Sequence, residues 1–426
     1  MKTVLFISYV FPPTGGAGVQ RVLKFVKYLP GHGWRPVVIT PRNPSAPLKD
    51  PSYLADLPPE VVVRRLWSLE PPARLAASLA PASAWGGRQG GGFKARLKSL
   101  AGSLAFPDRH LAWLPTALPG ALAAAVRHRA RVVLVTGPPF SSFVLGAAVA
   151  GILGLPLVLD FRDEWSGFFS KGYQAHGGGP YWRAAVRRLE AALVGRAARV
   201  IGNTPSMTRR LHQRHGGPPE KYLWIPNGYD PDDFRFLRQD PPRPRVEPGR
   251  LHLLYTGTVF QSHPLDDLWA GLERLSVQQR RRVAVEIVGR VVPGEVADPG
   301  LEGLSVRVLP YEPHRQVLRR MASAGVLLLT LADLPGLESM VPAKLFEYLA
   351  VRRPVLAVAP PGEATRIVEA TGCGAVVPPG RPAELAGLLG SWLEQPPPPP
   401  PPPPAAFDRR RLAGRLARLL AEAAGL

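Results

Sequence analysis

Short runs of β-branched and leucine residues alternate with longer helical patterns along most of the chain. Buried parallel strands read as near-continuous apolar runs, each followed by a helix, so this alternation predicts two parallel α/β sheets. In the first half, strands are expected at 3–8, 36–40, 61–64, 132–136, 156–160 and 200–202. In the second half they are expected at 251–256, 283–288, 306–309, 326–330, 354–359 and 375–377.

Proline and glycine mark the expected domain boundaries. The segment 225–230 reads Ile-Pro-Asn-Gly-Tyr-Asp and is followed by Pro- and Arg-rich sequence over 240–249, which predicts turns and a linker. Nine consecutive prolines at 396–404 predict an extended spacer. We therefore expect a domain at 1–226, a second at 227–395, a proline-rich spacer at 396–406 and a terminal helix at 407–426. That helix carries leucines on one side, at 412, 416, 419 and 420, and is expected to pack back on the first domain.

Composition excludes several classes of protein. At 426 residues, with 46% hydrophobic and 20% charged residues, most of the chain is expected to fold, into two or three domains. The single cysteine, Cys373, excludes an intrachain disulfide and a cysteine-based zinc site. Residues 1–11 read as a buried strand and not as a signal peptide. The apolar run 143–159 is interrupted by glycines and Pro156, so it predicts a helix, a turn and a strand instead of a membrane span.

A formal charge of +21 indicates an anionic partner: a small substrate, a membrane surface or nucleic acid. Compositional bias is the alternative, since 51 prolines and 43 glycines accompany the many arginines. Nucleic acid is the weakest reading, because no basic stripe interleaves with aromatic residues. Residues 93–104 place apolar and basic residues on different helical faces, as a helix lying on an anionic bilayer does, although the same stripe could pack on a core. A cytoplasmic protein attached peripherally to the inner face of the plasma membrane is the expectation.

Three segments carry candidate chemistry. Glycines at 15, 16 and 18 lie between the first strand and a helix, where backbone N–H groups can hold an anion, although a plain turn explains them as well. Asp160, Arg162 and Asp163 lie at the end of a predicted buried strand, where ligands bind in open parallel sheets; a structural Arg162–aspartate salt bridge is the alternative. Lys344 and Glu347 share one face of a predicted helix that Pro342 begins, and could hold a diphosphate and a ribose or form an ordinary surface pair.

Together these blocks resemble the family 4 retaining glycosyltransferases, and more closely the bacterial branch used in polysaccharide and lipid-linked glycan assembly. The resemblance rests on their order: PPTGGAGVQRVLKFVKYL, DFRDEW, VIGNTPSM, IPNGYDPDDF, LLYTGT, VEIVGR and VPAKLFEYLAVRRPVLAV. It implies the GT-B fold, with two Rossmann-like, doubly wound domains facing an interdomain cleft and a C-terminal helix returning to the N-terminal domain. It also implies transfer of a hexosyl or N-acetylhexosaminyl group from a nucleotide-diphosphate sugar to a glycan or lipid-linked acceptor, with retention, no metal and no cofactor.

The resemblance also assigns residues. Glu347 matches the second glutamate of the family's E-x7-E pattern, which binds the ribose, whereas the first falls at Ser339, next to Glu338. The loop 257–263 lacks the lysine or arginine that often grips the diphosphate, which leaves His263 or a more distant cation such as Arg290 or Arg21. Asp163, then Asp160, with Arg162, are the expected catalytic residues. The resemblance implies that the carboxylates orient the acceptor hydroxyl or stabilise a developing oxocarbenium ion, while the leaving phosphate oxygen takes the acceptor's proton. The expected donor-binding residues are Gly15, Gly16, Gly18, Gly257, Thr258, Arg290, Lys344, Leu345 and Glu347, and Tyr311 could stack on the base.

Two alternatives stay open at this point. A sugar-nucleotide epimerase of the same fold would use the same phosphate and ribose contacts. A catalytically silent sugar-nucleotide-binding subunit would explain Ser339 and the missing loop cation.

Overall fold

The computed structural model describes residues 1–45, 48–70, 106–169, 179–243 and 249–426. These residues form two compact units. Unit 1 contains the described residues up to 227 together with 408–426, and unit 2 contains those from 228 to 407. The basic amphipathic helix predicted at 93–104 lies outside the described residues.

Unit 1 is built on a seven-stranded parallel sheet in the order β3-β2-β1-β4-β5-β6-β7. Every strand expected in the first half of the sequence is present. Among the strands of the described residues the sequence missed only β7, whose three residues are too few to show a pattern. The strands are β1 (Lys2–Ile7), β2 (Trp34–Pro41), β3 (Val62–Leu66), β4 (Ala130–Gly137), β5 (Leu157–Phe161), β6 (Arg199–Gly202) and β7 (Tyr222–Trp224).

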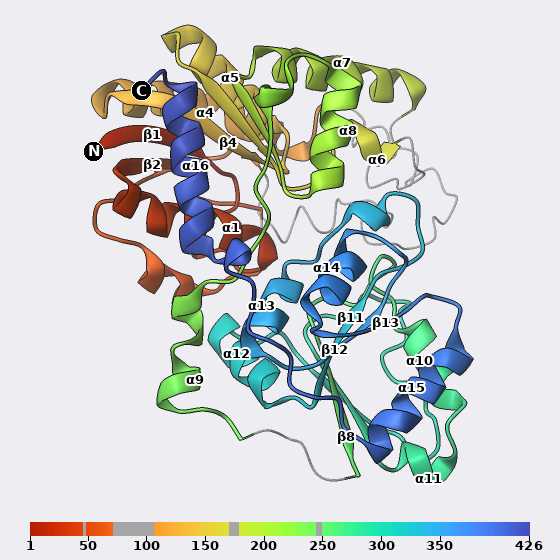
Figure 1. The fold of residues 1–426 in the computed structure, drawn as a ribbon. Coiled ribbons are helices and arrows are strands. Elements are labelled where there is room, and N and C mark those ends of the chain that lie inside the picture. Colours follow the sequence, from red (N-terminus) through yellow and green to blue (C-terminus); the bar gives the residue numbers. More distant parts are fainter. Residues whose placement is uncertain (46–47, 71–105, 170–178, 244–248) are drawn as a thin grey trace. The chain divides into compact units, whose positions relative to one another are not determined.

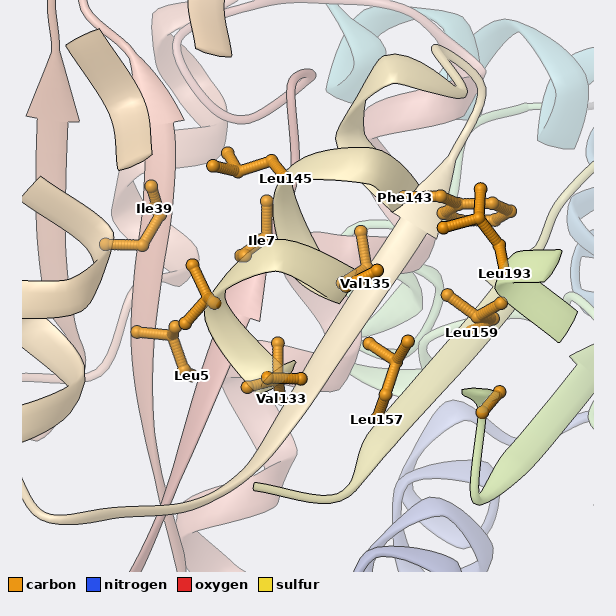
Figure 2. Packing of buried hydrophobic residues seen from close by; sticks show 14 of the residues in the cluster. Leu5, Ile7, Ile39, Val133, Val135, Phe143, Leu145, Leu157, Leu159 and Leu193 are labelled. Atoms are coloured by element: carbon orange, nitrogen blue, oxygen red, sulfur yellow. The ribbon is translucent and has the colours of Figure 1, made fainter. Parts of the chain in front are cut away.

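Helices cover both faces of this sheet because successive strand residues point to opposite sides. Leu5 and Ile7 pack toward α4, α5 and α7, in the cluster shown in Figure 2, whereas Val4 and Phe6 pack toward α1 and α16. The apolar run 143–159 forms a helix, a turn at Gly154 and a strand, as predicted. The helices of this unit in the described residues are α1 (Ala17–Tyr28), α4 (Leu114–Arg127), α5 (Ser141–Leu153), α6 (Ser166–Phe169), α7 (Pro180–Arg196), α8 (Pro205–His215) and α16 (Arg409–Ala423).

The C-terminal helix α16 lies beside α1 in unit 1 (Figure 1). Leucines 412, 416, 419 and 420 are all buried there, in one cluster with Val22, Phe25 and Val26 of α1. The Trp34 indole N–H also donates to the carbonyl of Ala417 at 3.1 Å. The predicted return of this helix to the N-terminal domain is confirmed.

Unit 2 is built on a six-stranded parallel sheet in the order β10-β9-β8-β11-β12-β13. All six strands expected in the second half are present: β8 (Leu251–Thr256), β9 (Val283–Val288), β10 (Ser305–Leu309), β11 (Val326–Thr330), β12 (Val355–Val358) and β13 (Gly374–Val377). Its helices in the described residues are α9 (Phe236–Gln239), α10 (Asp266–Glu273), α11 (Val277–Arg280), α12 (His314–Ser323), α13 (Lys344–Val351), α14 (Glu363–Thr371) and α15 (Pro382–Glu394).

The proline run forms neither helix nor strand, as expected, and its Pro400 carbonyl accepts a hydrogen bond from Arg352 at 3.2 Å. No helix in the described parts of the chain combines the length and the apolarity needed to cross a bilayer.

Strand order reverses once in each sheet, between β1 and β4 in unit 1 and between β8 and β11 in unit 2. Loops that leave neighbouring strands in opposite directions open a crevice at such a switch point, beyond the carboxyl ends of the strands. The candidate residues of each unit lie at the carboxyl ends of strands at or beside its switch point, or in the segments that follow those strands.

Candidate functional site

The glycine loop of unit 1 is tied to its neighbours through its backbone. Gly16, at φ 97°, precedes α1. The Gly15 N–H donates to the Leu48 carbonyl at 3.0 Å, and the Gly18 carbonyl accepts from Arg162 at 2.6 Å. A Cβ at Gly18 would lie 3.2 Å from that guanidinium. The absence of a side chain at Gly18 therefore permits a close approach, and the group that approaches is the Arg162 side chain of the same unit.

Arg162 joins three loops at the carboxyl edge of the unit 1 sheet. Besides Gly18, its guanidinium donates to the Pro138 carbonyl, which follows β4. The side chain is 9% exposed, its Nε has no partner in the described residues, and burial lowers its pKa. The expected alternative of an Arg162–aspartate salt bridge is not found among these residues. Arg162 instead holds the glycine loop against the ends of β4 and β5.

Asp160 pairs with a different arginine. Arg21 of α1 donates to both carboxylate oxygens, at 2.7 Å from Nη2 and 3.0 Å from Nε, and Thr136 adds a third bond at 2.8 Å. Arg21 is 1% exposed and Asp160 2%. The same guanidinium donates to the carbonyls of Ile225 and Pro226 at 2.9 Å each. Arg21 is thus enclosed in unit 1, and Asp160 serves it as a counter-ion.

Asp163 lies at the same edge of the sheet and differs from Asp160 in the contacts of its carboxylate. It is partly buried, and among the described residues its side chain forms no hydrogen bond or ion pair. Burial raises its pKa, while the nearby Arg162 charge acts in the opposite direction. Its neighbour Glu164 is fully committed, since it pairs with both Arg210 and Arg214. These bonds fix the loop on one side of Asp163, as Arg162 does on the other.

Lys344 is the central cation of unit 2. Its ammonium donates to the Thr256 carbonyl at 3.0 Å and lies 3.6 Å above the centre of the Tyr255 ring. Both partners end β8, so Lys344 lies at the switch point of this sheet. Burial lowers the pKa of Lys344 to about 7. An anion at this place would stabilise the charged ammonium.

Two glycine turns lie against each other beside Lys344. Gly257, after β8, has φ 116°, and Gly289, after β9, has φ 143°. The Val259 N–H donates to the Arg290 carbonyl at 2.8 Å, which brings exposed Arg290 next to the loop after β8. His263 follows in the same loop, and burial and then the Lys344 charge lower its pKa to about 3. Of the two cations that the sequence offered for this loop, a neutral imidazole favours the more distant one over His263.

We expect Gly289→Ala to disrupt this pair of turns. A Cβ at Gly289 would lie 2.0 Å from the Gly257 carbonyl oxygen, so the overlap is with backbone and no rotamer relieves it. Gly294→Ala is the matched control, since Gly294 also has positive φ, 98°, but open space around it. Gly289→Ala should cost about 1–3 kcal/mol more unfolding free energy than Gly294→Ala. Chemical denaturation of both variants measures the difference, and equal costs would contradict the packing described.

Glu347 lies one turn beyond Lys344 on α13 and is 8% exposed. Its Oε1 lies 2.8 Å from Nε2 of His314, the first residue of α12. Leu345, between the two charged residues, is fully buried in the core, and its N–H donates to the Pro342 carbonyl. The Leu345 side chain is therefore part of the core, and it fixes the backbone between the two charged residues.

The first glutamate position of E-x7-E is structural here. Ser339 is 4% exposed, and its hydroxyl donates to the Gly336 carbonyl at 2.7 Å. The Glu338 carboxylate accepts from the Gly336 N–H and lines a hollow of about 380 Å³ together with Gly362, Thr365 and Arg366. The Glu338 side chain therefore bonds to its own loop and also lines this hollow.

The family model described as Glycosyltransferase Family 4 matches residues 14–233, more than half of the chain. The chain belongs to glycosyltransferase family 4. As a member of that family it is a glycosyltransferase that uses a nucleotide-sugar donor. No match was found among curated proteins.

Solved structures place this glycosyltransferase in the GT-B fold. HepE from Anabaena, in complex with UDP-glucose, is 17% identical with a TM-score of 0.58, covering 99% of this chain and 95% of its own. WaaG, a glycosyltransferase involved in lipopolysaccharide biosynthesis, is 16% identical with a TM-score of 0.55, covering 99% and 98%. A protein from Listeria monocytogenes assigned as a UDP-N-acetylglucosamine 2-epimerase is 11% identical with a TM-score of 0.53, covering 99% and 96%. At these identities the likeness shows the fold alone.

Sequence reasoning missed His314 and Tyr255 as parts of the glycosyltransferase's candidate site. His314 precedes Glu347 by 33 positions, and no motif links the two. Tyr255 reads only as an alternating core position of a buried strand, and it packs accordingly in the sheet core. Both residues are brought to the site by the packing of helices and strands, and a single sequence does not show which elements pack together.

Proposed function

We propose that this glycosyltransferase transfers a hexosyl or N-acetylhexosaminyl group from a UDP-sugar to a hydroxyl of a glycan or lipid-linked acceptor, with retention of configuration. The UDP-glucose and UDP complexes of HepE support the choice of uridine, and the role of WaaG in lipopolysaccharide biosynthesis supports the acceptor class. The observation that carries the proposal is the position of Lys344 and Glu347. A cation at the switch point and a carboxylate one turn further match the diphosphate and the ribose of such a donor.

The donor half of the proposal lies in unit 2. The leaving diphosphate gains negative charge as the bond to the sugar breaks, so preorganised cations lower the barrier. Lys344 is held in place by Thr256 and Tyr255, and Arg290 is exposed beside the same glycine turn. Gly257 and Thr258 form the backbone that faces the diphosphate. Glu347 accepts hydrogen bonds from the ribose hydroxyls.

The acceptor half lies in unit 1, with Asp163 as the residue that orients the reacting hydroxyl. In the transfer, the bond from the anomeric carbon to the leaving phosphate oxygen breaks, and a bond from the acceptor oxygen forms on the same face. The acceptor proton passes to the leaving phosphate oxygen, so Asp163 need not act as a strong base. A partly buried carboxylate outside any ion pair of the described residues suits hydroxyl orientation and stabilisation of the developing positive charge.

A thermal-shift panel of UDP-, GDP- and ADP-glucose and their N-acetylglucosamine counterparts tests the donor. A ligand present at 100 times its dissociation constant stabilises the fold by about 2.7 kcal/mol, so a fitting donor should raise the melting temperature. We expect the shift with UDP-sugars and its loss in Glu347→Ala. A shift with none of the six sugars, or one that Glu347→Ala leaves intact, would refute the donor assignment.

Incubation with the stabilising sugar nucleotide alone separates the remaining alternatives. A transferase is expected to hydrolyse it slowly without an acceptor and to leave its stereochemistry intact. Conversion to an epimer, followed by proton NMR, would identify an epimerase. Binding with neither hydrolysis nor epimerisation would identify a silent binding subunit.

A further inference from the structure

A histidine is bonded to the proposed ribose-binding carboxylate. His314 Nε2 lies 2.8 Å from Glu347 Oε1, and the two side chains are 10% and 11% exposed. An ionised carboxylate only accepts hydrogen bonds, so the imidazole nitrogen that faces it carries the proton and donates it. The contact is therefore directional, from His314 to Glu347.

The two residues come from neighbouring helices that leave different strands. His314 begins α12, after β10, and Glu347 lies in the first turn of α13. The helices pack against each other through the core around Leu318 and Leu345, which fixes the distance between their first turns. A glutamate side chain has three rotatable bonds, and a bond to a rigid neighbour selects one of their arrangements.

A fixed carboxylate can still bind a ligand. It has about four lone-pair directions, so it can accept from His314 and from ribose hydroxyls together. Without the imidazole, Glu347 loses one of the contacts that order it, so more of its ordering comes at the expense of binding energy when the nucleotide arrives. The loss of binding energy would concern the contacts to the ribose hydroxyls, and the contacts to the base and the diphosphate would be unchanged.

We propose that His314 is a positioning residue that holds Glu347 for the 2′- and 3′-hydroxyls of the donor ribose and so determines selection for ribose. This inference rests on the proposed function, in which Glu347 binds the nucleotide ribose. His314 does not touch the reacting atoms. It acts through the Glu347 carboxylate, and the substitution His314→Gln would keep a hydrogen-bond donor of similar reach.

The test compares UDP with 2′,3′-dideoxyuridine diphosphate by calorimetric titration of the full-length protein. His314→Leu is expected to weaken UDP about tenfold, the value of one hydrogen bond to a charged group at the lower end of its range. Binding of the dideoxy nucleotide should stay within about twofold, because it lacks the hydroxyls that Glu347 accepts from. His314→Gln should restore most of the UDP affinity. Arg319→Gln is the control on the same helix, where an exposed arginine pairs with exposed Asp240.

The possible outcomes distinguish the role of His314 from the proposed function, in which Glu347 binds the donor ribose. Equal weakening of both nucleotides by His314→Leu, or no recovery in His314→Gln, would assign His314 a merely structural role and overturn the inference. UDP binding that depends on Glu347 but not on His314 would overturn it while leaving the proposed function intact. Absence of UDP binding in the unaltered protein would overturn both. If His314→Leu fails to fold, the His314→Gln variant decides, since it must retain the preference for UDP.

Discussion

Replacing Lys344 by methionine should lower kcat/KM for sugar transfer about 10²–10³-fold, as expected when one preorganised group that stabilises transition-state charge is removed. Methionine keeps the length of the side chain and its contact with the Tyr255 ring. It lacks the ammonium, which in the unaltered protein donates to the Thr256 carbonyl. Burial lowers the pKa of Lys344, so the fold carries a cost for its charge that offsets part of the lost bond to Thr256. The variant should therefore be folded, with a loss of stability of no more than about 1–2 kcal/mol. Transfer rates and a thermal melt of the same preparation measure both effects.

The pH dependence of UDP binding identifies Lys344 more specifically. With a pKa of about 7 in the free protein, Lys344 is increasingly neutral above pH 7. A bound diphosphate favours the ammonium and raises its pKa, so binding takes up a proton at these pH values. The UDP affinity should therefore fall as the pH rises from 7, by at most about tenfold per pH unit. His263 contributes nothing here, because its pKa of about 3 keeps it neutral throughout.

Titrations of UDP between pH 7 and 9, in two buffers of different ionisation enthalpy, count the protons taken up. The dependence should disappear in Lys344→Met and persist in Arg319→Met, which removes an exposed charge from the same unit. A slope that survives in Lys344→Met would mean that another group titrates, and Lys344 would then not contact the diphosphate.

The fold was largely predictable because a strand that is buried on both faces consists of consecutive apolar residues, which are visible in the sequence. Val133 and Val135 face one layer of helices and Val132 and Leu134 the other, so the whole run is apolar whichever way a residue points. The three-residue β7 has no such run, and only its pairing with β6 makes it a strand. Its position depends on the rest of the sheet being in place.

The site was predictable only where chemistry is local in sequence. Lys344 and Glu347 are three residues apart on one helix, so their common face follows from the helical repeat. Asp160 is different: the sequence offers Arg162 as its neighbour, but the structure pairs it with Arg21, 139 positions away. A strand places Asp160 and Arg162 on one side of the chain, yet Arg162 bonds backbone carbonyls instead, because loops approach it closely. Such choices depend on tertiary packing and not on spacing.

The Arg21–Asp160 pair should be among the most costly sites in unit 1 to alter. We expect Asp160→Ala to lower the free energy of unfolding of this unit by about 3–5 kcal/mol, because it leaves a buried guanidinium without its counter-ion. At 1% exposure Arg21 cannot turn to solvent, and its bonds to Ile225 and Pro226 hold it in place. For a unit of this size the loss corresponds to a fall of roughly 6–20 °C in its melting temperature, measurable by scanning calorimetry.

Glu422→Ala is the matched control, since Glu422 pairs with Arg199 in the same unit at 3.8 Å but is 58% exposed. It should change stability by no more than about 1 kcal/mol, as exposed pairs do. The double variant Arg21→Met with Asp160→Leu removes both charges and should recover much of the stability, because a buried ion pair is often replaceable by apolar residues of similar volume. If Asp160→Ala instead melts like the unaltered protein while abolishing transfer, the carboxylate serves the reaction and not the fold. Asp160 would then replace Asp163 as the residue that orients the acceptor hydroxyl.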